Sequence, residues 1–462
     1  MGTLTADATT RALVVGLAGA TLTRSEQAWI ERYEPAGVIL FARNVGAGES
    51  FSSLMASLRS CLKPDAEIVA DHEGGPVSVL ARVAGRPPAP WAMGVVDDPD
   101  LTRRVHAATG GRLRDLGVDR VLGPCCDVVT VSRNLMIGSR AFGADADRVA
   151  RHARAAVEGL RETGVSCCLK HWPGHGATAE DTHQTVVTEV GPRLESPFTA
   201  AFDAGADAVM LGHLPWTAQG PPASLDPLAA ASLRASRPGL GLWSDDLTMA
   251  AVRPTLIERT GHDPGGAGLI DPGDLPRSWL EAAVAGGSDR FLIRGIPWGA
   301  FPIEDGPGPE LDAGLGVPFG STSAPDESWT EVRHRCGGRE PVTGSLVWLD
   351  GSPGHRWGSL TVNDVRRAGW EGAIVPLGAE QPSTSSPLLL VTSQIPLEDH
   401  DLLRLKEWVS LQTGTGALLP VILLGHPSLR DDVSNVLRNC QITACGFDVT
   451  TEELTARFEY SG

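Results

Sequence analysis

Short apolar segments alternate with amphipathic segments over the first two thirds of the chain. The apolar segments are rich in Val, Ile and Leu and nearly continuous, which is typical of parallel strands that are buried on both faces. Eight such segments occur, at 12–17, 37–42, 67–71, 119–124, 166–171, 208–213, 240–245 and 290–295. The intervening stretches have helical periodicity, and several open with Ser or Asp and end on Gly, as capped helices do: 25–34, 98–117, 145–164 and 226–237.

Eight strands connected by helices over about 300 residues predict an α/β fold of the (β/α)8, TIM-like barrel type. A doubly wound open sheet is the main alternative. That fold usually has fewer strands and a glycine-rich phosphate loop after the first strand, and "GLAGATLT" at 16–23 is a poor match to such a loop.

The pattern changes after the eighth apolar segment. Residues 295–328 are rich in Gly, Pro and Ser and show no periodicity, as expected of a linker. Beyond them, five strand-like segments are separated by helical patterns such as 398–414. We therefore expect a barrel domain at 1–300, a linker at 301–328 and a smaller α/β sandwich domain at 329–462.

Composition excludes several classes of protein. The 462 residues are 42% hydrophobic and 21% charged, as in a soluble globular protein, and no apolar run is long enough to span a membrane. The net charge of −17 argues against nucleic acid or anionic membranes as partners. The first residues lack a signal-peptide pattern, so we expect a cytoplasmic protein. Without any CxxC pair, the eight cysteines predict neither structural zinc nor a disulfide framework.

Polar residues gather where the predicted strands end, which is the end of a barrel that carries the active site. They are Asp71, Asp127, Lys170, His171, His213 and Asp245. Lysine occurs only three times in this arginine-rich chain, which indicates that Lys170 is there because a compact ammonium group is needed. For Asp127 and His213, a structural role and a place on the pocket wall are equally consistent with the sequence.

The segment "CLKHWPGHGATAEDTH" (168–183) resembles the signature of the β-N-acetylglucosaminidases of glycoside hydrolase family 3. Four further segments agree in the same order: "GVILFARN" (37–44), "DHEGG" (71–75), "IGSRAFG" (137–143) and "SDDLTM" (244–249). The resemblance covers roughly residues 10 to 300. The C-terminal part is similar, more faintly, to the α/β sandwich domain of the family.

This resemblance implies a retaining exo-glycosidase that releases terminal β-linked N-acetylglucosamine from a small-molecule glycoside, without a cofactor or metal. Asp245 would be the nucleophile, His183 the acid/base and Asp181 the residue that orients it. The sugar would be bound by four other side chains, those of Asp71, Arg140, Lys170 and His171.

The chemistry is reasonable on its own terms. Retaining glycosidases usually place two carboxyl groups about 5 Å apart, one as nucleophile and one as acid/base. A histidine in the second role has an ordinary pKa of about 6.5. An Asp two residues before it, as Asp181 precedes His183, can fix its tautomer, and a neutral His adds no second negative charge beside Asp245.

Two rival assignments involve the same residues. Asp246 could replace Asp245 as nucleophile, although its side chain could instead face away and cap the following helix. His171, His175, Asp181 and His183 could form a metal site, but their spacing matches no common zinc pattern and Lys170 would place a cation beside the ion. His175 is better explained as a residue that holds the shape of the glycine-rich turn.

The chain departs from the family pattern in the segment after Asp71. Family members continue D-Q-E-G-G-R-V-Q-R, whereas here Pro76 and Val79 occupy the two arginine positions, and Ala177 replaces an Asp that usually follows G-H-G. The catalytic set is retained while part of the substrate shell is not, so the aglycone need not be a standard cell-wall fragment. A β-N-acetylglucosaminide phosphorylase and a non-catalytic saccharide-binding pseudoglycosidase are the alternatives.

Overall fold

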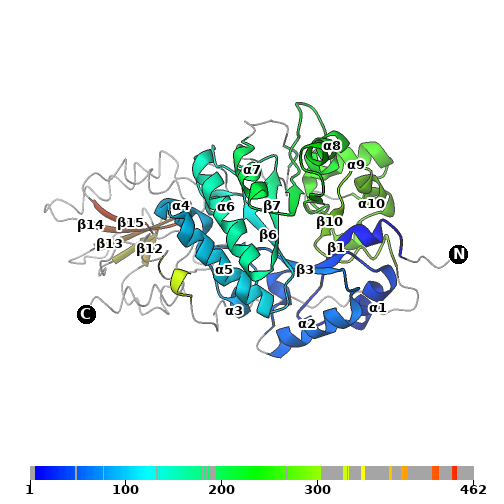
Figure 1. The fold of residues 1–462 in the computed structure, drawn as a ribbon, viewed down its shortest axis with the longest axis horizontal. Coiled ribbons are helices and arrows are strands. Elements are labelled where there is room, and N and C mark those ends of the chain that lie inside the picture. The colour runs from blue at the N-terminus through cyan, green and yellow to red at the C-terminus, as the bar shows by residue number, and fades with distance from the viewer. Residues whose placement is uncertain are drawn as a thin grey trace.

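Eight parallel strands close into a barrel in the computed structural model of the chain (Figure 1). The structure describes residues 6–302 apart from 47–48, 76, 132–133, 135, 179, 181, 183–184, 188–193 and 266–268, and then 326–329, 331 and five strands between 345 and 444. The barrel order is β1-β10-β9-β8-β7-β6-β3-β2. The strands are β1 (Leu13–Gly16), β2 (Gly37–Leu40), β3 (Glu67–Ala70), β6 (Arg120–Cys125), β7 (Ser166–Trp172), β8 (Ala208–Leu211), β9 (Gly241–Ser244) and β10 (Arg290–Ile293). All eight coincide with the predicted segments, and the predicted barrel is confirmed.

Apolar side chains fill both faces of these strands, which explains why the segments are nearly continuous in hydrophobicity. One cluster fills the barrel interior and takes at least one residue from every strand: Val14, Ile39, Val69, Leu122, Cys168, Ala208, Met210, Trp243 and Leu292. The alternate residues, such as Leu13 and Val15 on β1, belong to a larger cluster between the strands and the helices.

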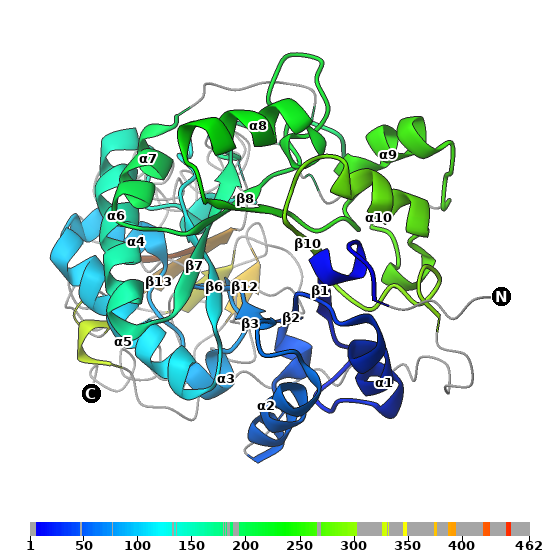
Figure 2. The same cartoon turned by 45° about the vertical axis from the view of Figure 1, so that its right-hand side comes forward.

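Helices surround the barrel, as the turned view in Figure 2 shows. They are α1 (Arg24–Tyr33), α2 (Glu49–Cys61), α3 (Ala81–Ala84), α4 (Pro90–Val96), α5 (Pro99–Asp115), α6 (Ala146–Thr163), α7 (Ser196–Asp203), α8 (Pro227–Ser236), α9 (Arg253–Thr260) and α10 (Arg277–Val284). Short 3-10 helices add η1 (Thr10–Ala12), η2 (Ala42–Asn44), η3 (Gly138–Arg140), η4 (Ala223–Leu225), η5 (Ala250–Val252) and η6 (Pro272–Asp274).

The helix ends follow the capping residues in the sequence. The Asp145 side chain accepts a hydrogen bond from the backbone N–H of Arg148 and starts α6, which ends at Gly164 in the left-handed region (φ 81°). Thr23 and Glu26 form a capping box at the start of α1. None of the helices in the described part of the chain is both long enough and apolar enough to cross a membrane.

A small antiparallel hairpin follows β3 and matters for the site. It consists of β4 (His72–Gly74) and β5 (Val77–Ser78). Gly74 lies at φ 107°, and a Cβ atom there would come within 2.1 Å of the Pro88 carbonyl oxygen, so a side chain is excluded. The hairpin contacts β6 and carries Glu73 to the end of the barrel where β3 terminates.

A second, parallel sheet forms in the C-terminal part, with the order β12-β11-β13-β14-β15. Its strands are β11 (Ser345–Trp348), β12 (Ile374–Pro376), β13 (Pro387–Ser393), β14 (Leu419–Gly425) and β15 (Cys440–Ala444). They overlap the five strand-like segments of the sequence, which are 344–351, 372–378, 387–395, 419–426 and 442–448. The boundaries of the second domain stay a prediction. The predicted helix at 398–414 lies outside the described residues, as does most of the predicted linker.

The barrel is joined to the residues that follow it by a buried tryptophan. Trp329, the first residue of the predicted second domain, is 1% exposed. Its indole N–H donates to the Val105 carbonyl oxygen on α5 (3.4 Å), and the Arg112 guanidinium lies 4.4 Å from the centre of its ring. Trp329 therefore packs directly on α5 of the barrel.

Candidate active site

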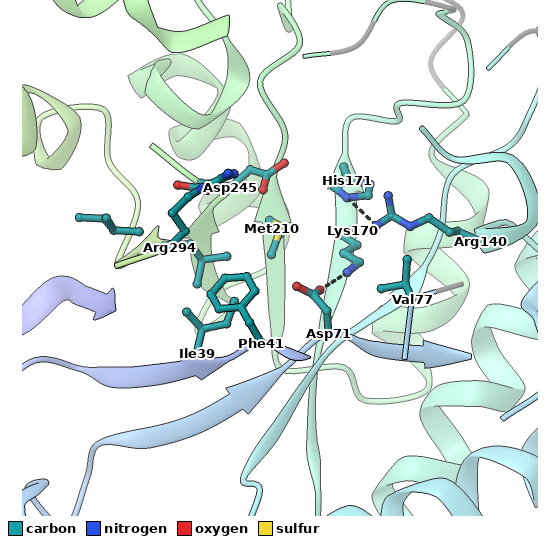
Figure 3. A pocket seen from close by; sticks show the side chains of 13 residues that line it. Ile39, Phe41, Asp71, Val77, Arg140, Lys170, His171, Met210, Asp245 and Arg294 are labelled. Atoms are coloured by element: carbon teal, nitrogen blue, oxygen red, sulfur yellow. Dashed lines mark hydrogen bonds and ion pairs between the residues drawn. The ribbon is translucent and has the colours of Figure 1, made fainter. Parts of the chain in front are cut away.

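A cavity of about 220 Å³ opens where β3, β7, β9 and β10 end (Figure 3). This volume is below the range typical of drug-sized ligands and suits a ligand the size of one sugar ring. Five predicted site residues line the cavity: Asp71, Arg140, Lys170, His171 and Asp245. The other lining residues are Ile39, Phe41, Val77, Met210, Asp246, Leu292, Ile293 and Arg294. Residues that lie more than 170 positions apart in the sequence therefore meet in one cavity, as the rule that strand ends carry the site predicts.

One side of the cavity is a network of charges that we call the β3–β7 wall; it consists of Asp71, Glu73, Arg140, Lys170 and His171. The Lys170 ammonium donates to Asp71 Oδ1 (2.5 Å) and also contacts Glu73 Oε1. Arg140 makes a two-pronged contact with Glu73, at 2.9 Å from Nε and 2.8 Å from Nη2. Each buried cation therefore has a carboxylate partner, as burial requires.

Glu73 is a site residue that the sequence analysis did not single out. Its side chain is fully buried at the centre of the β3–β7 wall. Burial alone would raise the pKa of Glu73, but the charges of Arg140 and Lys170 outweigh this effect and lower the pKa to about 2. Burial alone would lower the pKa of Lys170, and the carboxylates of Asp71 and Glu73 raise it instead. Glu73 and Lys170 are therefore both charged at neutral pH.

His171 is held between an acceptor and a donor. Its Nδ1 lies 2.7 Å from Asp127 Oδ2, and its Nε2 lies 3.3 Å from Arg140 Nη2. Because the carboxylate only accepts and the guanidinium only donates, the arrangement fits the neutral tautomer with its proton on Nδ1. Asp127 itself is fully buried and does not line the cavity. It positions His171 from behind the β3–β7 wall.

Asp127 also holds the turn that follows β7. Its Oδ1 accepts a hydrogen bond from the backbone N–H of His175 (2.6 Å). Burial would raise the pKa of Asp127, and His171 together with the His175 N–H lowers it below its usual range. Burial lowers the pKa of His175 to about 4, so this histidine is neutral at neutral pH.

The opposite side of the cavity, which we call the β9–β10 wall, consists of Asp245, Asp246 and Arg294. In Figure 3, Asp245 and Arg294 lie across the cavity from Lys170 and His171. The Asp246 carboxylate accepts from the Thr248 backbone and hydroxyl (2.9 and 2.8 Å) and pairs with Arg294 (2.7 Å). Asp246 thus holds the turn that reaches Thr248 and lines the cavity, which differs from the expectation that it faces away and caps the following helix.

His213 lies beside the cavity and not on its wall. It is 1% exposed, its Nδ1 lies 2.7 Å from the Ser224 hydroxyl, and its Nε2 lies 2.8 Å from the Asp246 carbonyl oxygen. His213 therefore fixes the backbone next to Asp245. Trp172 is also buried, with its ring centre 6.0 Å from that of Trp216, so it packs within the protein.

Asp181 and His183, the predicted acid/base pair, lie outside the described residues, but Thr182 between them is described. Thr182 is 2% exposed. Its hydroxyl lies 3.1 Å from His175 Nε2, and its carbonyl oxygen accepts from the backbone N–H of Ala251 (3.2 Å), six residues after Asp245. The segment that follows β7 thus contacts the segment that follows β9.

The hairpin that lacks the family arginines gives the cavity an apolar edge. Val77 lines the cavity, and the backbone N–H of Val79 donates to the Asp71 carbonyl oxygen (3.0 Å). Pro76 lies outside the described residues. The Val79 position therefore supports Asp71 through the backbone, whatever its side chain.

Three buried groups in the described part of the chain lie close enough together to hold a metal ion: Cys125, Asp127 and His171 have ligand atoms within 4.8 Å of one another. The Cys125 thiol donates to Asp127 (3.1 Å), and burial raises its pKa well above the ordinary value. A metal site needs the thiolate. The donor atoms are better explained as a hydrogen-bonded support for His171.

The fold and the cavity define a (β/α)8-barrel enzyme with a carboxylate facing a buried cationic cluster. The sequence model of a known family, described as "Glycosyl hydrolase family 3 N terminal domain", matches residues 9–255. A "Beta-hexosaminidase" of Xylella fastidiosa (strain 9a5c) is 35% identical over 257 residues, which are 52% of this chain and 76% of that protein. The chain belongs to glycosyl hydrolase family 3 and is a glycoside hydrolase.

Solved structures agree on the architecture. A glycoside hydrolase family 3 β-N-acetylglucosaminidase from Paenibacillus sp. str. FPU-7 has the same fold, with a TM-score of 0.70, 22% identity and coverage of 97% of this chain and 94% of that chain. NagZ from Neisseria gonorrhoeae in complex with N-trifluoroacetyl-D-glucosamine is 26% identical, with a TM-score of 0.52 over 61% of this chain and 80% of that chain. The comparison with the Paenibacillus structure includes the C-terminal part of this chain, whereas the comparison with NagZ covers a smaller share of the chain.

Proposed function

We propose that this glycoside hydrolase releases terminal β-linked N-acetylglucosamine with retention of anomeric configuration. The observation that carries the proposal is the placement of Asp245 on the β9–β10 wall, facing Lys170 and His171 across one sugar-sized cavity. The printed names of the β-hexosaminidase from Xylella fastidiosa and of NagZ with its N-acylglucosamine ligand support N-acetylglucosamine as the sugar.

In the first step of the proposed reaction, an Asp245 carboxylate oxygen attacks the anomeric carbon and the bond from that carbon to the aglycone oxygen breaks. His183 gives its proton to the departing oxygen, and Asp181 orients and polarises the His183 imidazole for this transfer. The product is a covalent glycosyl–enzyme ester on Asp245. The positive charge that develops on the sugar is stabilised by the negative Asp245.

In the second step, neutral His183 takes a proton from water and the water oxygen attacks the same carbon. The ester bond breaks, Asp245 regains its charge, and two inversions give net retention. His183 ends the cycle protonated, as it began. A neutral base avoids a second carboxylate beside the ester during this step.

The β3–β7 wall would bind the sugar. One oxygen of Asp71 accepts from Lys170, and we propose that the other accepts from a sugar hydroxyl. Arg140, Lys170 and His171 line the same space and would contact the hydroxyls and the acetamido group. Because these groups are already held by Glu73 and Asp127, little ordering is needed when the sugar binds.

The remaining parts of the proposal concern the whole protein. Residues 1–300 would act as the catalytic domain, 301–328 as the linker and 329–462 as a C-terminal α/β domain, in a cytoplasmic protein. The loss of both family arginines, at Pro76 and Val79, favours an aglycone other than a standard cell-wall fragment. Cell fractionation tests the location.

The proposal is tested by incubating the full chain with 4-nitrophenyl β-N-acetylglucosaminide and β-glucoside, with and without phosphate. We expect hydrolysis of the first substrate, product of retained configuration by NMR, and no sugar 1-phosphate. Phosphate-dependent formation of sugar 1-phosphate would instead indicate a phosphorylase. Binding of N-acetylglucosamine without turnover would indicate a pseudoglycosidase.

The nucleophile is tested separately. Asp245→Ala should lower kcat by at least about four orders of magnitude, as loss of a nucleophile does in other enzymes. Added azide should then attack the anomeric carbon from the vacated side and give the α-glycosyl azide. A variant that keeps the wild-type rate would rule out Asp245 as the nucleophile.

A further inference from the structure

Hydrogen-bonding capacity is distributed unevenly among the three cations of the cavity. Arg140 uses Nε and Nη2 on Glu73, Nη1 on the Met136 carbonyl oxygen (2.9 Å) and Nη2 again toward His171. Lys170 has two carboxylate partners for its three N–H bonds. Most N–H groups of the cations in the β3–β7 wall are therefore already hydrogen-bonded within the protein.

Arg294 differs from them. Its Nε and Nη2 both approach a single oxygen, Asp246 Oδ2, at 2.8 and 2.7 Å. Within the described residues, no acceptor lies within hydrogen-bond distance of Nη1, and the side chain is 30% exposed while lining the cavity. Arg294 thus carries the largest donor capacity on the cavity wall that the protein leaves unused.

The position of Arg294 is also fixed before any ligand binds. Its carbonyl oxygen accepts from Arg43 and packs on Gly16, where a Cβ atom would come within 2.2 Å of it. Its side chain is oriented by Asp246, which Thr248 holds in turn. Fixed donors bind with a smaller loss of entropy than donors that must be ordered.

The charges around Arg294 indicate what it can bind. The cavity lining holds three carboxylates, Asp71, Asp245 and Asp246, against three cations, Arg140, Lys170 and Arg294, so its formal charge is zero. Asp246 already neutralises Arg294, and Asp245 beside it would repel an anion. A neutral oxygen acceptor fits this position better than a carboxylate or phosphate.

We infer that Arg294 is a substrate-binding residue that donates from Nη1 to a hydroxyl oxygen of the sugar in the cavity. The inference rests on the proposed function, because it assumes that the ligand is a sugar. Arg294 stands on the wall opposite the hairpin in which Pro76 and Val79 replace arginines, so the chain supplies a guanidinium from the end of β10. It is thereby expected to help determine which sugars are accepted.

A competing role for Arg294 would be indirect. Without it, the unpaired charge of Asp246 would disfavour the ionised form of the neighbouring Asp245. In that case only the charge balance would matter, and removing both members of the pair would restore activity. The two roles therefore predict different double-mutant results.

The experiment measures kcat and KM on 4-nitrophenyl β-N-acetylglucosaminide for wild type, Arg294→Met, Arg294→Lys, Asp246→Asn and the double variant Arg294→Met/Asp246→Asn. Loss of one charge-assisted hydrogen bond should lower kcat/KM about 10- to 150-fold in Arg294→Met. Arg294→Lys should stay at least about ten-fold low, because lysine restores the charge but not the Nη1 donor. The double variant should also stay low.

The inference would be overturned, and the indirect role established, by either of two results. One is an Arg294→Lys variant with the kcat/KM of the wild type, and the other is a double variant with the kcat/KM of Asp246→Asn. An upward shift of the acid limb of the pH profile in Arg294→Met, without a change in its height, would have the same consequence. Arg290→Met is the matched control, since Arg290 begins the same strand at the opposite end of the barrel and should leave kcat/KM within two-fold.

A series of 3-, 4- and 6-deoxy aryl N-acetylglucosaminides identifies the acceptor. We expect the ratio of wild-type to Arg294→Met kcat/KM to collapse toward one for a single deoxy substrate. An equal ratio for all three would overturn the hydroxyl assignment. Failure of the wild type on every glycoside would refute the proposed function itself, so the two failures are distinguishable.

Discussion

The two walls of the cavity differ in how deeply their charged side chains are buried and how completely these are paired. In the β3–β7 wall, the side chains of Lys170 and Glu73 are 2% and 0% exposed, and each charge is satisfied by another member of the wall. In the β9–β10 wall, Arg294 and Asp246 are 30% and 15% exposed, and Arg294 Nη1 has no acceptor among the residues that the structure describes. The first wall is thus a prebuilt, rigid surface, whereas the second keeps bonding capacity beside the proposed nucleophile.

The largest expected effect comes from breaking the β3–β7 wall at its centre. Glu73→Gln removes the carboxylate that Arg140 and Lys170 share, and it should lower the free energy of unfolding by about 3–5 kcal/mol because buried cations lose their partner. Urea denaturation measures this loss. Glu158→Gln is the matched control: its exposed pair with Arg154 (2.9 Å) should cost only about 0.3–0.5 kcal/mol. Equal losses in the two variants would contradict the description of the wall.

A smaller effect is expected from loosening the same wall from behind. Asp127→Asn replaces the charged acceptor of His171 with an amide, and it should lower kcat/KM about 10- to 150-fold, the range for hydrogen bonds to charged groups. Steady-state kinetics measures the change. Cys125→Ser keeps a donor toward Asp127 without touching His171, and it should remain within about three-fold of wild type. If Cys125→Ser lost as much as Asp127→Asn, the effect would belong to packing and not to His171.

The smallest effect is expected where a single hydroxyl, that of Thr182, contacts His175 within the segment that follows β7. Thr182→Val removes the contact with His175 but keeps the shape of the side chain, and it should lower kcat about two- to ten-fold, the value of one ordinary hydrogen bond. Thr182→Ser keeps the hydroxyl and should recover most of the rate. A serine variant as slow as the valine variant would show that the methyl group, and not the hydroxyl, is needed.

The barrel was predictable because each of its strands leaves a complete local signature. Both faces of every strand are buried, so strands such as β1 and β8 are continuous apolar segments in the sequence. The helix ends were predictable for a similar reason, since Asp145 and Gly164 mark the two ends of α6 by their own chemistry.

The site was predictable only in part, because the end of a strand fixes where a residue lies but not where its side chain points. Asp71, Lys170 and Asp245 face the cavity, whereas Asp127 and His213 turn into the protein and position their neighbours. Glu73 was overlooked because its approach to Lys170 depends on the β4–β5 hairpin. Arg294 ends the eighth strand, so the rule that identified the other residues would have found it too.

Trp329 has a practical consequence for how this protein can be dissected. A fragment cut at residue 302, shortly after the predicted end of the barrel domain, would remove the Trp329 indole and expose the part of α5 that it contacts. We expect such a fragment to self-associate through the exposed part of α5. A fragment that ends after residue 331 keeps Trp329 in place. Genetic dissection of this enzyme should therefore treat the tryptophan as part of the barrel.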